Sequence, residues 1–230
     1  MLGSCAWLAL EVKRREPVVT FYREWLDLPV VETTDAETRL DAGDTTLVLR
    51  RPDAVPRGGL HTHYAFSIPA GEYDDWWNRL DADFDLVEMD FGGARSLYLD
   101  DPAGNCVELG QRDVAGPGIA GVFEIVLEVA ALDRATDFYT DLGFEIVDRG
   151  SERARTRLTT GELDLELWEP QLGIADGRGG VHVDWGLRVG DARAVLDRVS
   201  DRARATEAAA EGLRLLDPDG HYLALVDGRA

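Results

Sequence analysis

The sequence predicts an α+β protein made of four βαβββ modules, arranged as two curved mixed sheets with helices outside. Three observations lead to this prediction. Two landmark sequences recur at nearly one spacing, Pro/Gly-rich breaks divide each half of the chain, and each quarter has a strand-like stretch followed by a helix and further strands. Together they predict duplicated modules within one chain of 230 residues.

The two landmarks define the repeat. Phe21-Tyr22 recurs as Phe138-Tyr139, 117 positions later, each pair on a predicted helix. The turn sequence Asp-Pro-x-Gly begins at Asp101 and again at Asp217, 116 positions later. Two independent landmarks with nearly equal shifts indicate two tandem repeats, which we place at residues 1–112 and 121–228.

Each repeat divides again. Segments 53–59 and 171–180 are rich in Pro and Gly, and segment 113–120 joins the repeats, so we expect four modules. Their boundaries are 3–52, 60–112, 121–170 and 181–228. Helices are expected at 70–81, 132–141 and 190–204, and strands at 60–68, 105–110, 122–129, 144–149, 154–159 and 163–168.

Composition limits the partners. Forty-four acidic residues against 24 basic ones give a net charge of −20, which repels phosphates and anionic lipids. Nucleic acid and membrane are therefore not expected as partners, whereas a small-molecule substrate is. The charge also predicts a salt-adapted source, because salt screens self-repulsion. Cys5 and Cys106 are far apart in sequence, and together with the lack of a signal peptide they favour a cytoplasmic protein, either monomer or homodimer.

Strand alternation selects the candidate site residues. Neighbouring side chains of a strand point to opposite faces, so the apolar stripes of these strands leave four polar side chains on the other face. They are His63, Glu108, Glu124 and Glu166. A single glutamate on a polar strand face is usually just solvated, so the prediction depends on the four occurring together.

These residues resemble the vicinal oxygen chelate superfamily, which includes glyoxalase I, methylmalonyl-CoA epimerase, fosfomycin-resistance proteins, bleomycin-resistance proteins and extradiol dioxygenases. The resemblance covers nearly the whole chain. It is carried by the two Phe-Tyr helices, the stretch from His63 to Phe66, and the Asp-Pro-x-Gly turns, the first of which is followed by Glu108-Leu109. It implies tandem glyoxalase-like repeats, with a metal held by the first and last strands of two modules.

The resemblance assigns two ligand positions to each module. From module one to module four these are Trp7 and Val48, His63 and Glu108, Glu124 and Glu166, and Asp184 and Ala224. If modules one and two pair, and three and four pair, neither sheet has a complete set. If module two pairs with module three and module one pairs with module four, one sheet has the complete set of metal ligands. The ligand positions of the other sheet are then degenerate. We favour the second arrangement.

The predicted cofactor is one divalent metal ion. One imidazole and three carboxylates suit Mn²⁺, Fe²⁺, Ni²⁺, Zn²⁺ or Mg²⁺. The metal would stabilise an enediolate-type intermediate of a small oxygen-chelating substrate, and Glu108 or Glu166 would serve as the general base. The resemblance therefore implies a metal-dependent, glyoxalase- or epimerase-like lyase or isomerase. Glu124 stands where the family more often has His or Gln, so the identity of the metal stays open.

Two alternatives remain. An extradiol-type dioxygenase would use two histidines and one carboxylate on Fe²⁺, and His61 is the nearest second histidine. A non-catalytic binding protein for drug-like molecules would use an apolar pocket. A larger set of side chains could line the substrate pocket in either case: His61, Phe91, Arg95, Tyr98 and Trp168, with Trp7 in the other sheet and Arg155 and Arg157 as further anion-binding candidates.

Overall fold

The computed structural model describes residues 1–52, 61–170, 183–209 and 212–228. The predicted breaks at 53–59 and 171–180 lie outside the described residues. Within these ranges the chain repeats one unit, a strand followed by a helix and three more strands, four times. This confirms the predicted α+β class and the βαβββ modules.

The bounds of the elements follow the modules. Module one contains β1 (Leu2–Glu11), α1 (Arg15–Glu24), β2 (Val30–Thr33), β3 (Glu37–Ala42) and β4 (Thr45–Arg50). Module two contains β5 (His61–Pro69), η1 (Ala70–Glu72), α2 (Tyr73–Leu80), β6 (Val87–Asp90), β7 (Arg95–Asp100) and β8 (Cys106–Arg112). Module three contains β9 (Gly121–Glu128), α3 (Leu132–Leu142), β10 (Glu145–Arg149), β11 (Arg155–Thr159) and β12 (Asp164–Trp168). Module four contains β13 (Val183–Val189), α4 (Ala192–Leu196), β14 (Ala205–Ala209), β15 (Gly212–Leu216) and β16 (Tyr222–Asp227).

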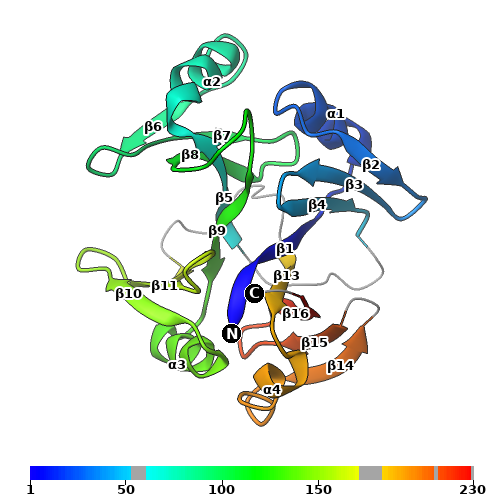
Figure 1. Ribbon diagram of the computed structural model, residues 1–230, viewed down its shortest axis with the longest axis vertical. Helices are drawn as coiled ribbons and strands as arrows, with labels where there is room; N and C mark the ends of the chain where they lie inside the picture. Colours follow the sequence, from blue (N-terminus) through cyan, green and yellow to red (C-terminus); the bar gives the residue numbers. More distant parts are fainter. Residues whose placement is uncertain (53–60, 171–182, 210–211, 229–230) are drawn as a thin grey trace.

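The strands form two eight-stranded mixed sheets. Sheet A has the order β14-β15-β16-β13-β1-β4-β3-β2, and sheet B has the order β10-β11-β12-β9-β5-β8-β7-β6. Modules one and four therefore share sheet A, and modules two and three share sheet B, as the favoured pairing requires. The division into repeats at 1–112 and 121–228 stays a prediction, since each sheet draws on both. Figure 1 shows β1, β5, β9 and β13 near the middle and the four α-helices at the periphery.

Alternating side chains place the core between each sheet and its helices. In β9, Ile125 and Leu127 are fully buried, and Tyr64 and Phe66 of β5 are as well. Each such side chain contributes roughly 1.5–3 kcal/mol by leaving water. The intervening residues of these strands point to the opposite side, which we call the inner face of the sheet. The apolar stripe therefore decides which residues reach the inner face.

Two equivalent tyrosine–aspartate hydrogen bonds tie the sheets together. Tyr22 on α1, above sheet A, donates to Asp101 in the β7–β8 turn of sheet B at 3.0 Å. Tyr139 on α3, above sheet B, donates to Asp217 in the β15–β16 turn of sheet A at 2.8 Å. All four side chains are at least 96% buried. The two sequence landmarks of the repeat are thus bonded to each other, helix to turn, across the sheets.

The helices agree with the predicted positions except in module four. The helix expected over 190–204 is limited to α4, because after Leu196 the backbone bonds become i→i−3, from Arg198 to Val195 and from Val199 to Leu196. None of the described helices is long and apolar enough to cross a bilayer.

We predict that Tyr139→Phe lowers the free energy of unfolding by about 1–3 kcal/mol, because it removes a buried donor from a buried carboxylate. Chemical denaturation monitored by tryptophan fluorescence would measure this loss. Tyr222→Phe is the matched control, since Tyr222 is only partly buried, and it should change the free energy by less than about 0.5 kcal/mol. Equal, small effects of both variants would contradict a structural role for the tie.

Candidate metal centre

Strand pairing sets the predicted ligands in two adjacent rows on the inner face of sheet B. The first row runs, by pairing, through Val87, Tyr98, Glu108, Ala65, Glu124 and Asp164. The second runs through Asp100, Cys106, His63, Val126, Glu166, Arg157 and Asp148. Neighbouring strands lie about 4.8 Å apart, so His63, Glu108, Glu124 and Glu166 share one small area.

The register has a local twofold symmetry between β5 and β9. His63 pairs with Val126, and Ala65 pairs with Glu124, so His63 and Glu124 hold equivalent positions. In the same way Glu108 pairs with Ala65 and Glu166 pairs with Val126. Each module therefore supplies one residue from its first strand and one from its last.

His63 and Glu108 form a buried pair. The Nε2 atom of His63 lies 3.3 Å from Oε2 of Glu108, and the residues are 9% and 3% exposed. Burial lowers the pKa of His63, but the hydrogen bond and charge of Glu108, helped by Glu124 and Glu166, outweigh it and raise that pKa above its usual value. All four predicted ligands therefore interact with one another.

Glu108 stays ionised. Burial raises the pKa of its carboxyl, but hydrogen bonding with His63, Ser96 and Tyr98 and the charge of His63 bring the pKa below its usual value. Glu108 is therefore a carboxylate at neutral pH.

Glu124 and Glu166 instead face arginines of β11. The Nη2 atom of Arg157 lies 3.1 Å from Oε2 of Glu124, and Nη1 of Arg155 lies 3.1 Å from Oε1 of Glu166. The other oxygen of Glu166 accepts a 2.7 Å hydrogen bond from the indole N–H of Trp168. Both carboxylates are thus ion-paired within the protein.

Among the three carboxyl groups, that of Glu124 has a strongly raised pKa. Burial, together with the negative charges of Glu166 and Glu108, raises its pKa to about 7, although Arg157 and His63 act in the opposite direction. The inner face therefore carries more carboxylate than its arginines and histidine fully compensate. A divalent cation would relieve that excess.

The four side chains are chemically suited to a divalent ion and lie on neighbouring strands, but they do not converge on one point. In the described part of the chain, no three His, Cys, Asp or Glu side chains stand close enough together to hold an ion as they are. Glu124 and Glu166 point to their arginine partners instead. The residues fit a metal provided that these two carboxylates exchange their partners.

Two predicted pocket residues flank the site. The ring of Tyr98 lies 5.5 Å from the ring of His63, and the ring of Trp168 lies 6.3 Å from it on the other side, both edge-on. Aromatic side chains next to the ligands would contact a bound substrate.

The other predicted pocket residues lie elsewhere. Arg95 bonds Asp74 and stacks on Tyr73 of α2, so it faces the helix side of the sheet and not the inner face. Phe91 is 65% exposed in the turn after β6. His61 begins β5, next to a shift in backbone register between His61 and His63, and the position of its side chain lies outside the described part of the structure.

The sequence prediction missed Asp164, Asp148 and Arg153. Asp164 and Asp148 are second partners of Arg157 and Arg155, at 3.0 and 2.7 Å. Arg153 lies over the ring of Trp168, 5.2 Å from its centroid. The available signal was the alternation of arginines at 153, 155 and 157, which is unusual in so acidic a chain.

Sheet A shows the same register with different residues. In sheet A, Trp7 pairs with Gly186, and Ala9 pairs with Asp184. These pairs correspond to His63 with Val126 and Ala65 with Glu124 in sheet B. Trp7, Ala9, Val48 and Ala224 form a separate apolar cluster. A Cβ at Gly186 would lie 2.4 Å from the indole nitrogen of Trp7, so glycine makes room for that ring. Asp184 is paired with Arg50 at 2.9 Å.

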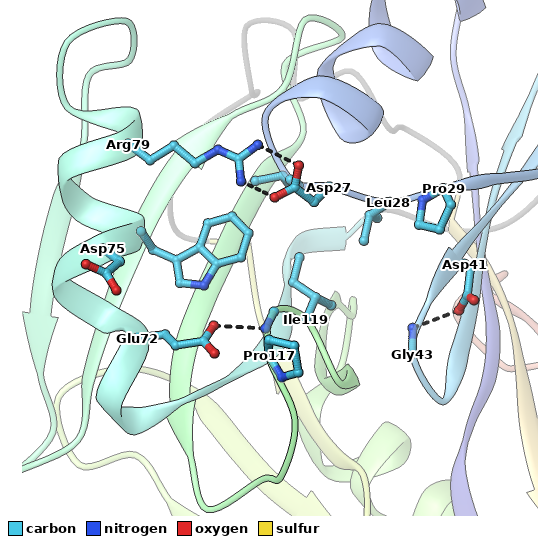
Figure 2. A pocket seen from close by; sticks show the side chains of 13 residues that line it. Asp27, Leu28, Pro29, Asp41, Gly43, Glu72, Asp75, Arg79, Pro117 and Ile119 are labelled. Atoms are coloured by element: carbon cyan, nitrogen blue, oxygen red, sulfur yellow. Dashed lines mark hydrogen bonds and ion pairs between the residues drawn. The ribbon is translucent and has the colours of Figure 1, made fainter.

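A pocket of about 610 Å³ lies away from the four candidate ligands, between the end of α1, the β3–β4 turn and α2. Figure 2 shows two of its acidic groups engaged: Arg79 pairs with both oxygens of Asp27, and Glu72 accepts a bond from the backbone of Gly118. None of the four candidate ligands lines this pocket. We therefore do not assign the active site to it.

The fold and the site have counterparts among known proteins, although no family model matches the chain. A dioxygenase candidate from Bacillus subtilis superposes with a TM-score of 0.77 at 16% identity, covering 100% of this chain and 86% of the other. Glyoxalase I from Zea mays superposes with a TM-score of 0.72 at 17% identity, covering 97% and 92%. The chain has the vicinal oxygen chelate fold. By sequence, the metallothiol transferase FosB of Staphylococcus haemolyticus is 26% identical over 98 residues, 40% of this chain and 70% of FosB.

The raised pKa of Glu124 predicts a pH-dependent stability. The folded-state pKa of about 7 lies above the usual 4.5, so between these values the folded state binds more protons and stability falls as pH rises. We predict that Glu124→Gln stabilises the metal-free protein by at most about 3 kcal/mol at pH 8 and has little effect at pH 4.5.

Urea denaturation in the presence of a chelator, at both pH values, measures this difference. Glu145→Gln, on the exposed edge strand β10, is the control and should leave the pH dependence unchanged. A Glu124→Gln variant that is equally or less stable than the wild type at pH 8 would show that the carboxylate is not strained by burial.

Proposed function

We propose that the protein is a metal-dependent lyase or isomerase of the glyoxalase type, acting on a small substrate with two adjacent oxygens. The observation that carries the proposal is the placement of His63, Glu108, Glu124 and Glu166 on β5, β8, β9 and β12, four neighbouring strands of one sheet. The fold shared with maize glyoxalase I supports this class, and the sequence similarity to a metallothiol transferase supports a metal-dependent enzyme.

The four side chains would hold one divalent ion, whose Lewis acidity would stabilise negative charge on a substrate oxygen. Fe²⁺, Mn²⁺, Ni²⁺ and Zn²⁺ all suit an imidazole–carboxylate set. His63 must give up its proton to bind, so its raised pKa makes binding proton-coupled.

The glutamates of the last strands have different roles in this proposal. Glu108 lies 3.3 Å from His63, which is buried, so its partner cannot easily be replaced. Both oxygens of Glu166 accept hydrogen bonds, from Arg155 and Trp168, but Arg155 is partly exposed. Because an exposed partner can be replaced by solvent or substrate, we assign the general base to Glu166 and the fixed ligand to Glu108.

An extradiol-type dioxygenase is the second candidate, because the fold of the Bacillus subtilis dioxygenase candidate matches the whole chain. The ligand set argues against it. Glu124 occupies the position that is equivalent by register to His63, where a two-histidine site would need its second imidazole.

Several wider features are part of the proposal. Both cysteines are free, which suits a reducing cytoplasm. The net charge of −20 suits a salt-adapted protein, so assays belong at high salt. One chain already supplies both modules of sheet B, so the site needs no second copy.

We predict about one tightly bound divalent ion per chain, measured by elemental analysis after dialysis in high salt. His63→Ala and Glu166→Ala should each lose it, because each removes one ligand. Asp184→Asn is the matched control, since Asp184 holds the equivalent position in sheet A, and it should keep the ion. Retention of the ion in both His63→Ala and Glu166→Ala would refute the shared site.

Activity assays separate the candidates. Isomerisation of a methylglyoxal–thiol adduct by the metal-loaded protein, lost in Glu166→Gln, is the expected result. Cleavage of catechol under O₂ without isomerisation would favour the dioxygenase. A metal-free protein that binds aromatic ligands would favour the drug-binding alternative.

A further inference from the structure

Strand β11 brings a row of arginines to the candidate site. Arg155 and Arg157 are separated by one residue and therefore share the inner face of sheet B. Each guanidinium contacts two carboxylates. Arg155 bridges Glu166 and Asp148, and Arg157 bridges Glu124 and Asp164. One partner of each arginine is a proposed metal ligand, and the other is not.

The equivalent positions in the other modules show what is specific to module three. By register, Arg157 faces Glu166, whereas Arg39 faces Val48 and Arg214 faces Ala224. In sheet A these arginines pair with glutamates outside the ligand positions. Arg39 pairs with Glu32 and Glu37, and Arg214 pairs with Glu207. In module three the arginine at this position instead contacts a ligand-position carboxylate, Glu124.

The arginines are also more exposed than the ligands that they contact. The side chains of Glu166 and Glu124 are 10% and 8% exposed, whereas those of Arg155 and Arg157 are 26% and 30% exposed. Both oxygens of Glu166 already accept a hydrogen bond, so a cation that binds this carboxylate must displace a donor. Asp148 and Asp164 would keep the arginines near the site if Glu166 and Glu124 turned away.

We propose that Arg155 and Arg157 compete with the metal ion for Glu166 and Glu124, and that, once displaced, they bind an anionic group of the substrate. The proposal rests on the proposed metal site. When the two glutamates turn to the ion, each guanidinium loses one of its two carboxylates and keeps the other. The freed N–H groups then point to a site beside the metal, where a carboxylate or phosphonate oxygen can accept them.

The first test is Mn²⁺ affinity, measured by isothermal titration calorimetry at fixed pH and salt. Arg155→Gln and Arg157→Gln should each bind Mn²⁺ about tenfold more tightly than the wild type, because no internal cation has to be displaced. Arg214→Gln, the equivalent residue of sheet A, is the matched control and should leave the affinity unchanged. Circular dichroism checks that each variant is folded, and Arg157→Lys, which keeps the charge, should lie between wild type and Arg157→Gln.

The outcomes separate the two proposals. Wild-type protein that binds one Mn²⁺, with equal or weaker binding in both glutamine variants, overturns the competition while leaving the metal site intact. If neither the wild type nor the variants bind Mn²⁺, the proposed function itself fails. Binding that appears only in the glutamine variants supports the competition directly.

The second test uses methylphosphonate as the probe anion. Wild-type protein loaded with Mn²⁺ should bind it at least about tenfold more tightly than metal-free protein, because the arginines are free only in the loaded state. In Arg155→Gln and Arg157→Gln the enhancement should fall to about twofold or less. An enhancement that persists in both variants would show that the anion sits on the metal alone and would overturn the anion-binding role.

Discussion

The antiparallel pairing of β5 with β9 is the constraint on which the rest of the site depends. These strands come from modules two and three, and their register sets His63 opposite Val126 and Ala65 opposite Glu124. A shift of one residue would move every side chain of one strand to the other face. Because β8 and β12 flank the pair, the same register also fixes the places of Glu108 and Glu166.

Much of this arrangement could be predicted from the sequence, because it follows from local alternation. A strand whose apolar residues are buried leaves its other residues on the inner face, and the duplication indicates which strands are equivalent. What a long side chain contacts could not be predicted in the same way. Arg157 lies opposite Glu166 by register, yet its guanidinium contacts Glu124 and Asp164. The bulge beside His61 and the shortness of α4 depend on tertiary packing, which periodicity does not report.

The two sheets show how one fold can keep a polar site or fill it. In sheet A, Trp7 occupies the space that Gly186 leaves, and the remaining charge at a ligand position, Asp184, is neutralised by Arg50. In sheet B, burial and the neighbouring carboxylates raise the pKa of Glu124 to about 7, even though Arg157 lies beside it. Ion pairs with arginine partly neutralise the carboxylates of sheet B. They allow the carboxylate cluster to fold without a bound cation.

The central claim is that one metal site lies between modules two and three and none between modules one and four. The most direct measurement is an anomalous difference map from a crystal of the protein grown with Mn²⁺. The account predicts one strong peak within coordination distance of His63, Glu108, Glu124 and Glu166. A strong peak in sheet A beside Asp184, or one in sheet B that is bound by neither His63 nor Glu166, would contradict it.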